Sequence, residues 1–227
     1  MGNSTKAFVL LSGGIDSAVC LQLALSEHDD VETIHYNYGQ QTFQREQENA
    51  RQQVQNDGIS FHVVDYRGVF RNFAEGTIQD QSYDSNTVSQ QGHSVGYVPQ
   101  RNLHLLVSGA AVAEHHTAVG RDIVLYIGAQ QNDVADYPDC RPEFIDAAER
   151  AINRSTEQHQ VTVKAPIIDS SKTGIIELGE ELGVDWSLTF SCYNDTDGQP
   201  CGECPACIER EEAFNKAGIE DPVLSAE

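Results

Sequence analysis

Two groups of residues in this 227-residue sequence have the types and the spacing that chemistry requires. Near the N-terminus, the string Ser12-Gly13-Gly14-Ile15-Asp16-Ser17 combines hydroxyls, glycines and a carboxylate in consecutive positions. Near the C-terminus, four thiols fall in one short segment, at Cys192, Cys201, Cys204 and Cys207. The first group is suited to hold phosphate, and the second is suited to hold a metal ion.

The N-terminal string lies between an apolar run at 7–11, which predicts a strand, and an apolar segment at 17–25, which predicts a helix. Glycines let the backbone approach an oxyanion, and the start of a helix adds amide donors and a positive dipole. Asp16 fits beside phosphate if a divalent cation bridges the two, or it simply caps the helix. The common dinucleotide and P-loop fingerprints are both absent.

The cysteine string has the spacing Cys-x8-Cys-x2-Cys-x2-Cys. Four thiolates complete a tetrahedral zinc shell, and a closed shell of this kind is structural, so we expect one zinc ion per chain. Three cysteines at two-residue gaps also occur in iron–sulfur sites, which remain the alternative. Cys20 and Cys140 stand alone, so the grouping indicates a metal site in a reducing compartment rather than a disulfide framework.

The remaining pattern predicts an α/β fold, a Rossmann-like parallel sheet with helices on both faces. Further strands are expected at 31–36, 59–64, 122–127 and 160–164, and further helices at 41–55, 101–116, 142–155 and 172–182. Residues 68–98 have weak periodicity and predict an irregular excursion near a ligand site. We expect a nucleotide-binding core over residues 1–190 and a small zinc-binding appendage with a helix over 191–227.

Two polar strings lie between these ends. Val98-Pro99-Gln100-Arg101-Asn102 precedes a predicted helix, where Arg101 and Asn102 could donate to a carboxylate or phosphate, although such an arginine can equally be a solvated surface residue. Residues 128–144 follow a predicted strand, and loops at the carboxyl ends of parallel strands line the ligand crevice. Asp136, Asp139 and Arg141 in this loop are therefore candidates for binding, or they form a turn with a local ion pair.

The composition is strongly acidic, with 35 Asp and Glu against 14 Lys and Arg and a formal net charge of -21. This charge repels a phosphate backbone, so we expect no direct binding to nucleic acid. Few of the basic residues are lysines, and a surface rich in carboxylate and poor in lysine is typical of extreme halophiles. We hold the halophile interpretation as a hypothesis, with an ordinary acidic protein as the alternative.

No apolar run approaches the roughly 20 residues that cross a bilayer. The N-terminus also has no charged leader followed by an apolar segment and a cleavage site. We therefore expect a cytoplasmic protein with no membrane partner.

Five blocks of the sequence carry a resemblance to one known family. They are residues 11–17, 98–102, 136–144, 166–172 with 181–185, and 191–193 with 201–207. The phosphate-binding string alone resembles only the superfamily of ATP pyrophosphatases, whereas Tyr137-Pro138-Asp139-Cys140-Arg141 and the cysteine string are more specific. Over nearly the whole chain the sequence resembles the 7-cyano-7-deazaguanine synthase family, nitrile-forming ligases of the queuosine and archaeosine pathways.

The resemblance implies an adenine nucleotide α hydrolase-like core that cleaves ATP between its α and β phosphates. Ser12, Gly13, Gly14 and Ser17 would bind the pyrophosphate end, and Asp16 would help to hold Mg2+. The whole implied nucleotide-binding segment is Leu11, Ser12, Gly13, Gly14, Ile15, Asp16, Ser17 and Ala18.

The implied substrates are 7-carboxy-7-deazaguanine and ammonia, and the implied assembly is a homodimer. A carboxylate is a poor electrophile, so its transfer to ATP gives an acyl adenylate that ammonia converts to an amide. The resemblance further implies that a second nucleotide activates the amide oxygen, whose departure leaves the nitrile. Lys172, Arg101 and Arg141 are candidates for offsetting negative charge on the α phosphate or the substrate carboxylate.

The substrate contacts are the least constrained part of this hypothesis. Asp136 or Asp139 could bind the amino and imino donors of the guanine-like edge, and Asn102 is a further candidate. The alternatives are another ATP pyrophosphatase, such as a tRNA-sulfurating or amidotransferase-type synthetase, or a nonenzymatic nucleotide-sensing zinc module. A sulfurating enzyme would need a basic face for tRNA, which the net charge of -21 disfavours. The halophile hypothesis, if correct, favours archaeosine over queuosine as the final product.

Overall fold

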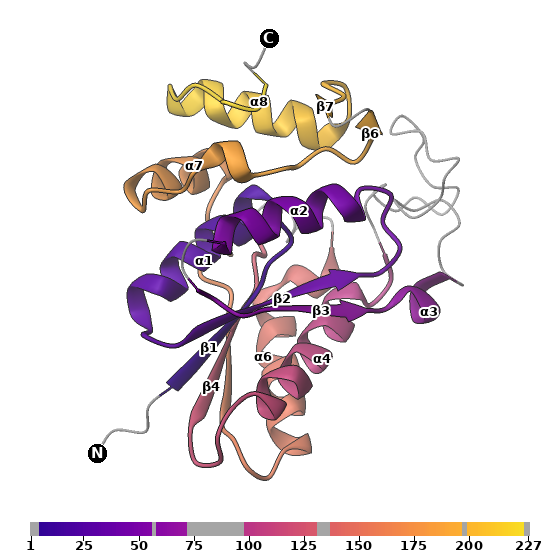
Figure 1. Cartoon of the computed structure of the whole chain (residues 1–227), viewed down its shortest axis with the longest axis vertical. Coiled ribbons are helices and arrows are strands. Elements are labelled where there is room, and N and C mark those ends of the chain that lie inside the picture. The colour runs from indigo at the N-terminus through magenta and orange to yellow at the C-terminus, as the bar shows by residue number, and fades with distance from the viewer. Residues whose placement is uncertain (1–4, 56–57, 72–97, 131–136, 197–198, 225–227) are drawn as a thin grey trace.

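A five-stranded parallel sheet, in the order β3-β2-β1-β4-β5, is the centre of this computed structural model (Figure 1). The residues described are 5–55, 58–71, 98–130, 137–196 and 199–224. The strands of the sheet are β1 (Thr5–Leu10), β2 (Val31–Asn37), β3 (Phe61–Asp65), β4 (Asp122–Tyr126) and β5 (Val161–Lys164). Each neighbouring pair is parallel, so the predicted α/β fold class is confirmed.

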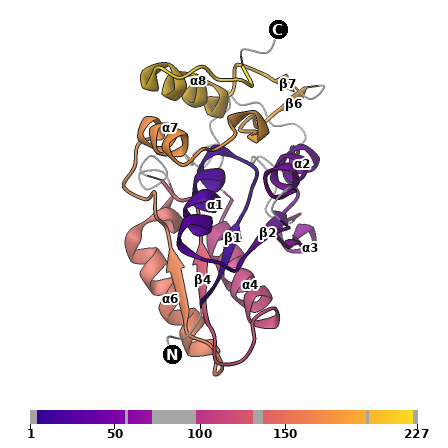
Figure 2. The same cartoon turned by 60° about the vertical axis from the view of Figure 1, so that its left-hand side comes forward.

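Helices cover both faces of this sheet (Figures 1 and 2). On one face lie α1 (Ile15–Glu27), α2 (Phe43–Val54) and α7 (Lys172–Glu181), with α8 (Pro205–Ala217) packed on α7. On the other face lie α4 (Arg101–His115) and α6 (Pro142–Ser155). The smaller elements are the helices α3 (Arg67–Phe70), η2 (Pro138–Cys140) and η3 (Trp186–Leu188), and a hairpin of β6 (Asp195–Thr196) and β7 (Gln199–Pro200).

Strand β1 is apolar along most of its length because both faces of the sheet are buried. Its alternate residues Ala7 and Val9 belong to the cluster under α1 and α7, whereas Phe8 and Leu10 belong to the cluster under α4 and α6. A sheet covered on both sides requires such continuous apolar runs instead of alternation. This central strand therefore fixes where the loop that follows it begins.

Local sequence signals set several helix ends. Proline occupies the first position of α6 and of α8, where its missing N–H costs no hydrogen bond. Gly218 ends α8 in the left-handed region, with φ of 70°. Gln100 precedes α4 with φ of 60°, a conformation that is uncommon for a residue with a side chain. The start of α4 is therefore a locally strained position.

The predicted strands and helices are confirmed, with ends that differ by at most two residues. The predicted irregular excursion is different at its start, because residues 67–70 form α3, and residues 72–97 lie outside the described part of the chain. At the C-terminus, Ala213 and Phe214 of α8 share the apolar cluster of α1 and α7. The division of the chain at residue 190 stays a prediction. Across the described ranges, none of the helices has the length and apolar character needed to cross a bilayer.

Candidate functional site

A cavity of about 290 Å3 opens at the carboxyl ends of the strands. The chain leaves β1 on one side to form β2, while β4 lies on the other side of β1, so the strand order reverses at this point. Ligands of open α/β sheets bind at such a reversal. The lining residues come from the segments after β1, β2 and β4, and from residues 190–193 and α8 near the C-terminus.

The loop after β1 presents its hydroxyl and backbone donors to this cavity. Ser12 Oγ lies 3.0 Å from Ser17 Oγ and accepts from the Gly14 N–H at 3.2 Å. Ser17 Oγ in turn donates to the Gly14 carbonyl at 3.0 Å. Helix α1 begins immediately after Gly14, so its first amides and positive dipole add to these donors. The arrangement is suited to an anionic oxygen group, as the sequence predicts.

Close backbone approaches explain two glycines at this site. Gly13 has φ of 90°, and a Cβ there would meet the Glu46 carbonyl oxygen of α2 at 2.5 Å. Gly128, after β4, would place a Cβ 3.1 Å from the backbone carbon of Asp16. A methyl group at either position would push the loop away from its neighbours.

Asp16 forms an ion pair with Lys172, which lies 156 residues later in the chain. The ammonium of Lys172, at the first position of α7, is 2.8 Å from both carboxylate oxygens of Asp16. Glu209 of α8 is 3.9 Å from the same ammonium. Both side chains line the cavity. They are largely shielded from solvent, since the side chains of Lys172 and Asp16 are 13% and 23% exposed.

The start of α4 places Arg101 and Asn102 at the cavity wall, in two different ways. The Arg101 guanidinium lies 5.8 Å from the centre of the Tyr38 ring, and its Nε donates to Asn102 Oδ1 at 3.5 Å. Asn102 is buried and donates from its side chain to the Asp139 carbonyl at 2.9 Å. The Asp139 carboxylate accepts from the Asn102 backbone N–H at 3.0 Å, in the first turn of α4. Asn102 and Asp139 thus hold η2 against α4.

The predicted site residues therefore divide into two groups. Those that line the cavity are Leu11, Ser12, Gly14, Ile15, Asp16, Ser17, Arg101, Asn102, Lys172 and Cys192. Gly13, Ala18, Asp139, Arg141, Cys201, Cys204 and Cys207 are not among the lining residues, and Arg141 precedes the first turn of α6. Asp136 lies outside the described residues.

A second group of cavity residues follows β2 and carries no recognisable motif in the sequence. Tyr38, Gln40, Thr42 and Glu46 also line the cavity. The Glu46 carboxylate accepts from Gln40 Nε2 at 2.9 Å and from Thr42 Oγ1 at 2.5 Å. Burial raises the pKa of Tyr38 to about 12, so its hydroxyl stays protonated at neutral pH. The position of these residues after a strand beside β1 is the signal that could have identified them.

Arg210 of α8 connects the C-terminal segment to the phosphate-binding loop. Its buried guanidinium forms two hydrogen bonds with Asp221, at 2.6 and 2.9 Å. It also donates to the Thr189 carbonyl at 3.3 Å. The neighbouring Phe190 donates its N–H to the Gly13 carbonyl at 2.9 Å. A short chain of contacts thus runs from α8 to the loop after β1.

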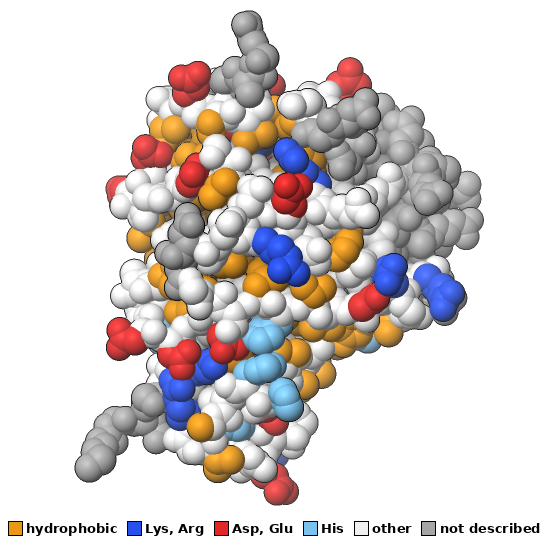
Figure 3. All heavy atoms as spheres, viewed as in Figure 1, with side chains coloured by type: hydrophobic (Ala, Val, Ile, Leu, Met, Phe, Trp, Pro, Cys, Tyr) orange, Lys and Arg blue, Asp and Glu red, His pale blue; other side chains and the backbone are white. Residues whose placement is uncertain are grey.

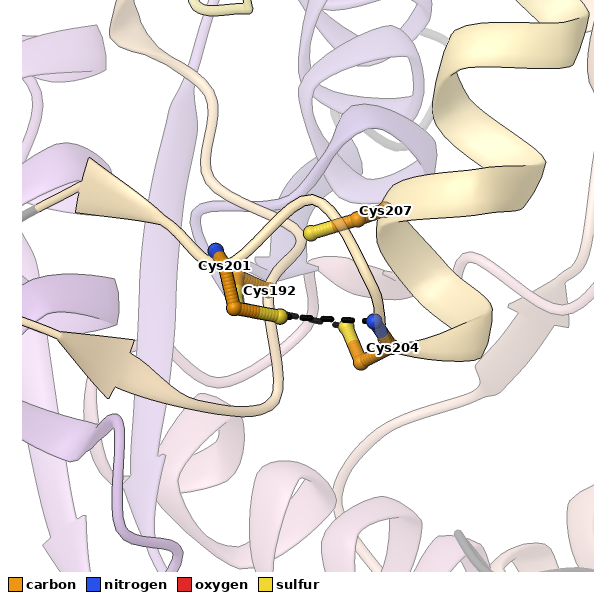
Figure 4. Close-up of side chains that lie close together, drawn as sticks. All are labelled: Cys192, Cys201, Cys204 and Cys207. Carbon is orange, nitrogen blue, oxygen red and sulfur yellow. Dashed lines mark hydrogen bonds between the residues drawn. The ribbon is translucent and has the colours of Figure 1, made fainter. Parts of the chain in front are cut away.

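The four cysteines converge in the C-terminal segment (Figure 4). Their sulfurs all lie within 4.8 Å of one another. Backbone N–H groups donate to two of the sulfurs, from Cys201 to Cys192 and from Cys204 to Cys201, both at 3.3 Å. Hydrogen bonds from Cys192 and Cys207 lower the pKa of Cys204 far below that of an ordinary thiol. Four converging sulfurs with amide donors around them are suited to a metal ion that prefers thiolate ligands.

The sheet order, the hydroxyl- and glycine-containing loop at the strand reversal and the Asp16–Lys172 pair define an open α/β protein with a cavity suited to an anionic ligand. Comparison with known families is more specific, because the family described as queuosine biosynthesis protein QueC matches residues 6–218. The chain belongs to this family.

Curated relatives agree with this assignment. The 7-cyano-7-deazaguanine synthase of Koribacter versatilis (strain Ellin345) is 37% identical over 98% of this chain and 94% of its own length. The protein of the same name from Dechloromonas aromatica (strain RCB) is 41% identical over 96% of this chain and 97% of its own length. Among solved structures, NMN synthetase from Francisella tularensis shares the fold, with a TM-score of 0.50, 16% identity, and coverage of 96% of this chain and 78% of that one.

Proposed function

We propose that this chain is an ATP-dependent 7-cyano-7-deazaguanine synthase, which converts 7-carboxy-7-deazaguanine and ammonia to 7-cyano-7-deazaguanine. The observation that carries the proposal is the full-length similarity to relatives of that name, together with a phosphate-binding loop that faces a cavity at the strand reversal. The queuosine pathway is the destination that the family description supports. A destination in archaeosine would follow only from the halophile hypothesis.

The chemistry assigned to this chain starts with a carboxylate, whose oxygen is a poor leaving group. Its attack on the α phosphate of ATP breaks the α–β bond, releases pyrophosphate and gives an acyl adenylate. Ammonia then displaces AMP to form the amide. Transfer of AMP from a second ATP to the amide oxygen would release pyrophosphate, and departure of that oxygen as part of AMP, with loss of two protons from nitrogen, would give the nitrile.

The residues of this chain act on the charge that develops in these steps. The hydroxyls of Ser12 and Ser17 and the amides at the start of α1 would stabilise the departing pyrophosphate. Lys172 and Arg101, both at the cavity wall, would offset charge on the α phosphate or on the substrate carboxylate. Arg141 was the third candidate, and its place outside the cavity lining gives it a weaker case than the other two.

Asp16 is the residue that we assign to Mg2+. Its carboxylate faces the cavity beside the phosphate-binding loop, and both of its oxygens already contact a cation, the Lys172 ammonium. Mg2+ prefers carboxylate and phosphate oxygens, and it neutralises charge on transferring phosphates. Lys172 would move from Asp16 toward the phosphates when the metal–nucleotide complex binds.

We assign one structural zinc ion to Cys192, Cys201, Cys204 and Cys207. The mutual distances of the sulfurs and their amide donors support this assignment, and four protein ligands leave no open coordination position for a substrate. The ion would secure the start of α8 and with it the position of Arg210. A homodimer and the absence of a direct nucleic-acid partner complete the proposal.

The decisive experiment incubates the protein with ATP, Mg2+, ammonium and 7-carboxy-7-deazaguanine, and follows the products by mass spectrometry. We expect 7-cyano-7-deazaguanine, AMP and pyrophosphate, with no nitrile when the acid, ATP or ammonium is omitted. Cleavage of ATP that does not depend on the deazaguanine acid would instead indicate another ATP pyrophosphatase. Binding of ATP without turnover under any of these conditions would indicate a nucleotide-sensing module.

A further inference from the structure

A cluster of Glu32, His62 and His116 lies away from the nucleotide cavity, and none of the three residues lines it. Their nearest ligand atoms, a carboxylate oxygen and two imidazole nitrogens, are all within 4.8 Å of one another. Figure 3 shows histidine side chains gathered on one face of the molecule, with acidic and basic side chains around them. We call these three residues the histidine–glutamate cluster.

Three different elements hold this cluster in place. Glu32 lies on β2, His62 lies on the edge strand β3, and His116 follows α4 directly. His62 pairs with Ile34, which lies two residues beyond Glu32, so Glu32 and His62 point to the same face of the sheet. The end of α4 then brings His116 against them, with the two imidazole ring centres 4.2 Å apart.

Both carboxylate oxygens of Glu32 have a polar partner, and the partner of Oε2 is itself a residue of the cluster. Lys6 Nζ donates to Oε1 of Glu32 at 2.6 Å, while His62 Nε2 lies 2.6 Å from the other oxygen, Oε2. Lys6 also donates to the His116 carbonyl at 3.0 Å and lies 3.8 Å from Asp30. Asp30 and the His116 carbonyl also offset the charge of the Lys6 ammonium. Lys6 would therefore keep these two partners if a cation bound at Oε2 of Glu32.

We propose that Glu32, His62 and His116 form a binding site for a transition-metal ion such as Zn2+, distinct from the four-cysteine group. Two imidazoles and one carboxylate are a donor set that Zn2+ accepts with a water molecule in the fourth position. Binding would replace the proton between His62 Nε2 and Glu32 Oε2 by the ion, and His116, which is exposed, would supply the third ligand.

A bound ion would stabilise the edge of the sheet. β3 is the outermost strand on its side, and the ion would fasten it to β2 and to the end of α4. A ligand that binds only the folded state raises the melting temperature. The nucleotide cavity lies at the other end of α4, where Arg101 begins the helix, so the ion would take no direct part in the reaction.

The test must separate this site from the cysteines, which also bind zinc in our proposal. Metal-free full-length protein is titrated with Zn2+ by calorimetry, and the bound metal is counted after dialysis. The variants are His62→Gln and His116→Gln, with His159→Gln as the matched control because His159 lies outside the cluster and bonds to the Arg121 carbonyl. Titration with Co2+ adds a spectroscopic readout, because only thiolate ligands give intense sulfur-to-metal charge-transfer absorption.

We expect two zinc equivalents for the parent protein and for His159→Gln, and one for His62→Gln and for His116→Gln. The thiolate absorption of the Co2+ protein should be the same in all four proteins, and the second equivalent should raise the melting temperature only where the cluster is intact. One equivalent in every protein would overturn the proposal. A second equivalent that survives in both cluster variants would also overturn it, because the ion would then bind elsewhere.

Discussion

Asp16 and Lys172, for which we propose metal binding and phosphate binding, contact each other directly. The carboxylate that we assign to Mg2+ and the ammonium that we assign to phosphate lie 2.8 Å apart and neutralise each other. The ion pair spares the cavity wall an unpaired charge, which would destabilise the fold because both side chains are largely buried. In our proposal, Asp16 would hold the metal and Lys172 would contact the phosphates, so two separate ion pairs would replace this one.

The first prediction concerns Asp16→Asn, which keeps the side-chain volume and removes the charge. We expect ATP-dependent nitrile formation to fall by at least about 100-fold, since a metal-binding carboxylate is lost where phosphate charge develops. The melting temperature should change little, because Lys172 retains Glu209 nearby. Steady-state assays and thermal denaturation measure the two effects, with exposed Asp146→Asn of α6 as the control. Near-normal turnover in saturating Mg2+ would contradict the assignment of Asp16.

A second prediction at the residue scale concerns acid stability and His35. Its ring is 1% exposed, contacts Phe43 and Phe61, and has Nδ1 2.7 Å from the Leu11 carbonyl. Burial lowers the pKa of His35 below its ordinary value of 6.5. Below pH about 6.5, His35 is protonated in the unfolded chain and stays neutral in the folded chain. The free energy of unfolding therefore decreases as pH falls below about 6.5.

Removing this group should make the unfolding free energy less dependent on pH. We expect His35→Gln to reduce the slope between pH 6.5 and 5 by up to about 1.4 kcal/mol per pH unit, the value for one proton. Urea denaturation at several pH values measures the slope, and His159→Gln should leave it unchanged. Equal slopes for the parent and for His35→Gln would show that His35 does not carry the effect.

At the scale of elements, the order of strands and helices follows from sequence pattern because each signal is local. The apolar run of β1, the proline that starts α6 and the cysteine spacing each act over a few residues. Contacts between distant segments carry no such signal. Asp16 meets Lys172, and Asn102 meets Asp139, through the packing of whole elements. The sequence pattern marks Asn102 and Asp139 as candidates for substrate binding, but it does not reveal the hydrogen bonds by which they join α4 to η2.

The buried pair of Arg210 and Asp221 gives a prediction about the attachment of α8. We expect Arg210→Gln to lower the unfolding free energy by about 3–5 kcal/mol, because Asp221 is left as a buried charge without its partner. Loss of the contacts to residues 186–191 should also raise the KM for ATP, since Phe190 bonds to Gly13. Arg210→Lys should restore part of both.

A double-mutant cycle tests the mechanism of this effect. The double variant Arg210→Met with Asp221→Leu should lose less unfolding free energy than its two single variants lose in sum, because no buried charge remains. The control is Lys216→Gln, whose exposed pair with Glu212 should contribute less than about 1 kcal/mol. Additive losses in the cycle would show that the two side chains act independently.

The cysteine group gives a prediction about how α8 begins. Cys204 precedes the first turn of α8, and Cys207 lies within that turn. We expect Cys204→Ser to lose the single sulfur-bound zinc and to melt at a lower temperature, because structural metal binding is coupled to folding. Metal analysis and calorimetry measure both effects, and Cys20→Ala, a buried thiol outside the group, should keep the zinc. Iron and a visible chromophore in anaerobically purified protein would replace the zinc assignment by an iron–sulfur one.

At the scale of the whole molecule, the formal net charge of -21 remains on the surface, because the buried ion pairs are neutral. Some of the few basic residues are used inside the fold, since Arg210 is buried against Asp221 and Lys6 is buried against Glu32. Many of the carboxylates on the outside therefore lack a compensating cation. Repulsion among such charges opposes the compact state.

The last prediction is that melting temperature rises with potassium chloride. Screening relieves the repulsion as the Debye length contracts from about 10 Å at 0.1 M to about 3 Å at 1 M. Screening saturates beyond that concentration, so a further rise up to about 3 M would require an added contribution from salting-out of apolar surface. Nitrile formation should persist in this range, because phosphates held in a cavity are screened less than exposed charges. A melting temperature that is flat or falls with salt, and activity that is highest in dilute buffer, would exclude halophilic adaptation and leave the proposed reaction untouched.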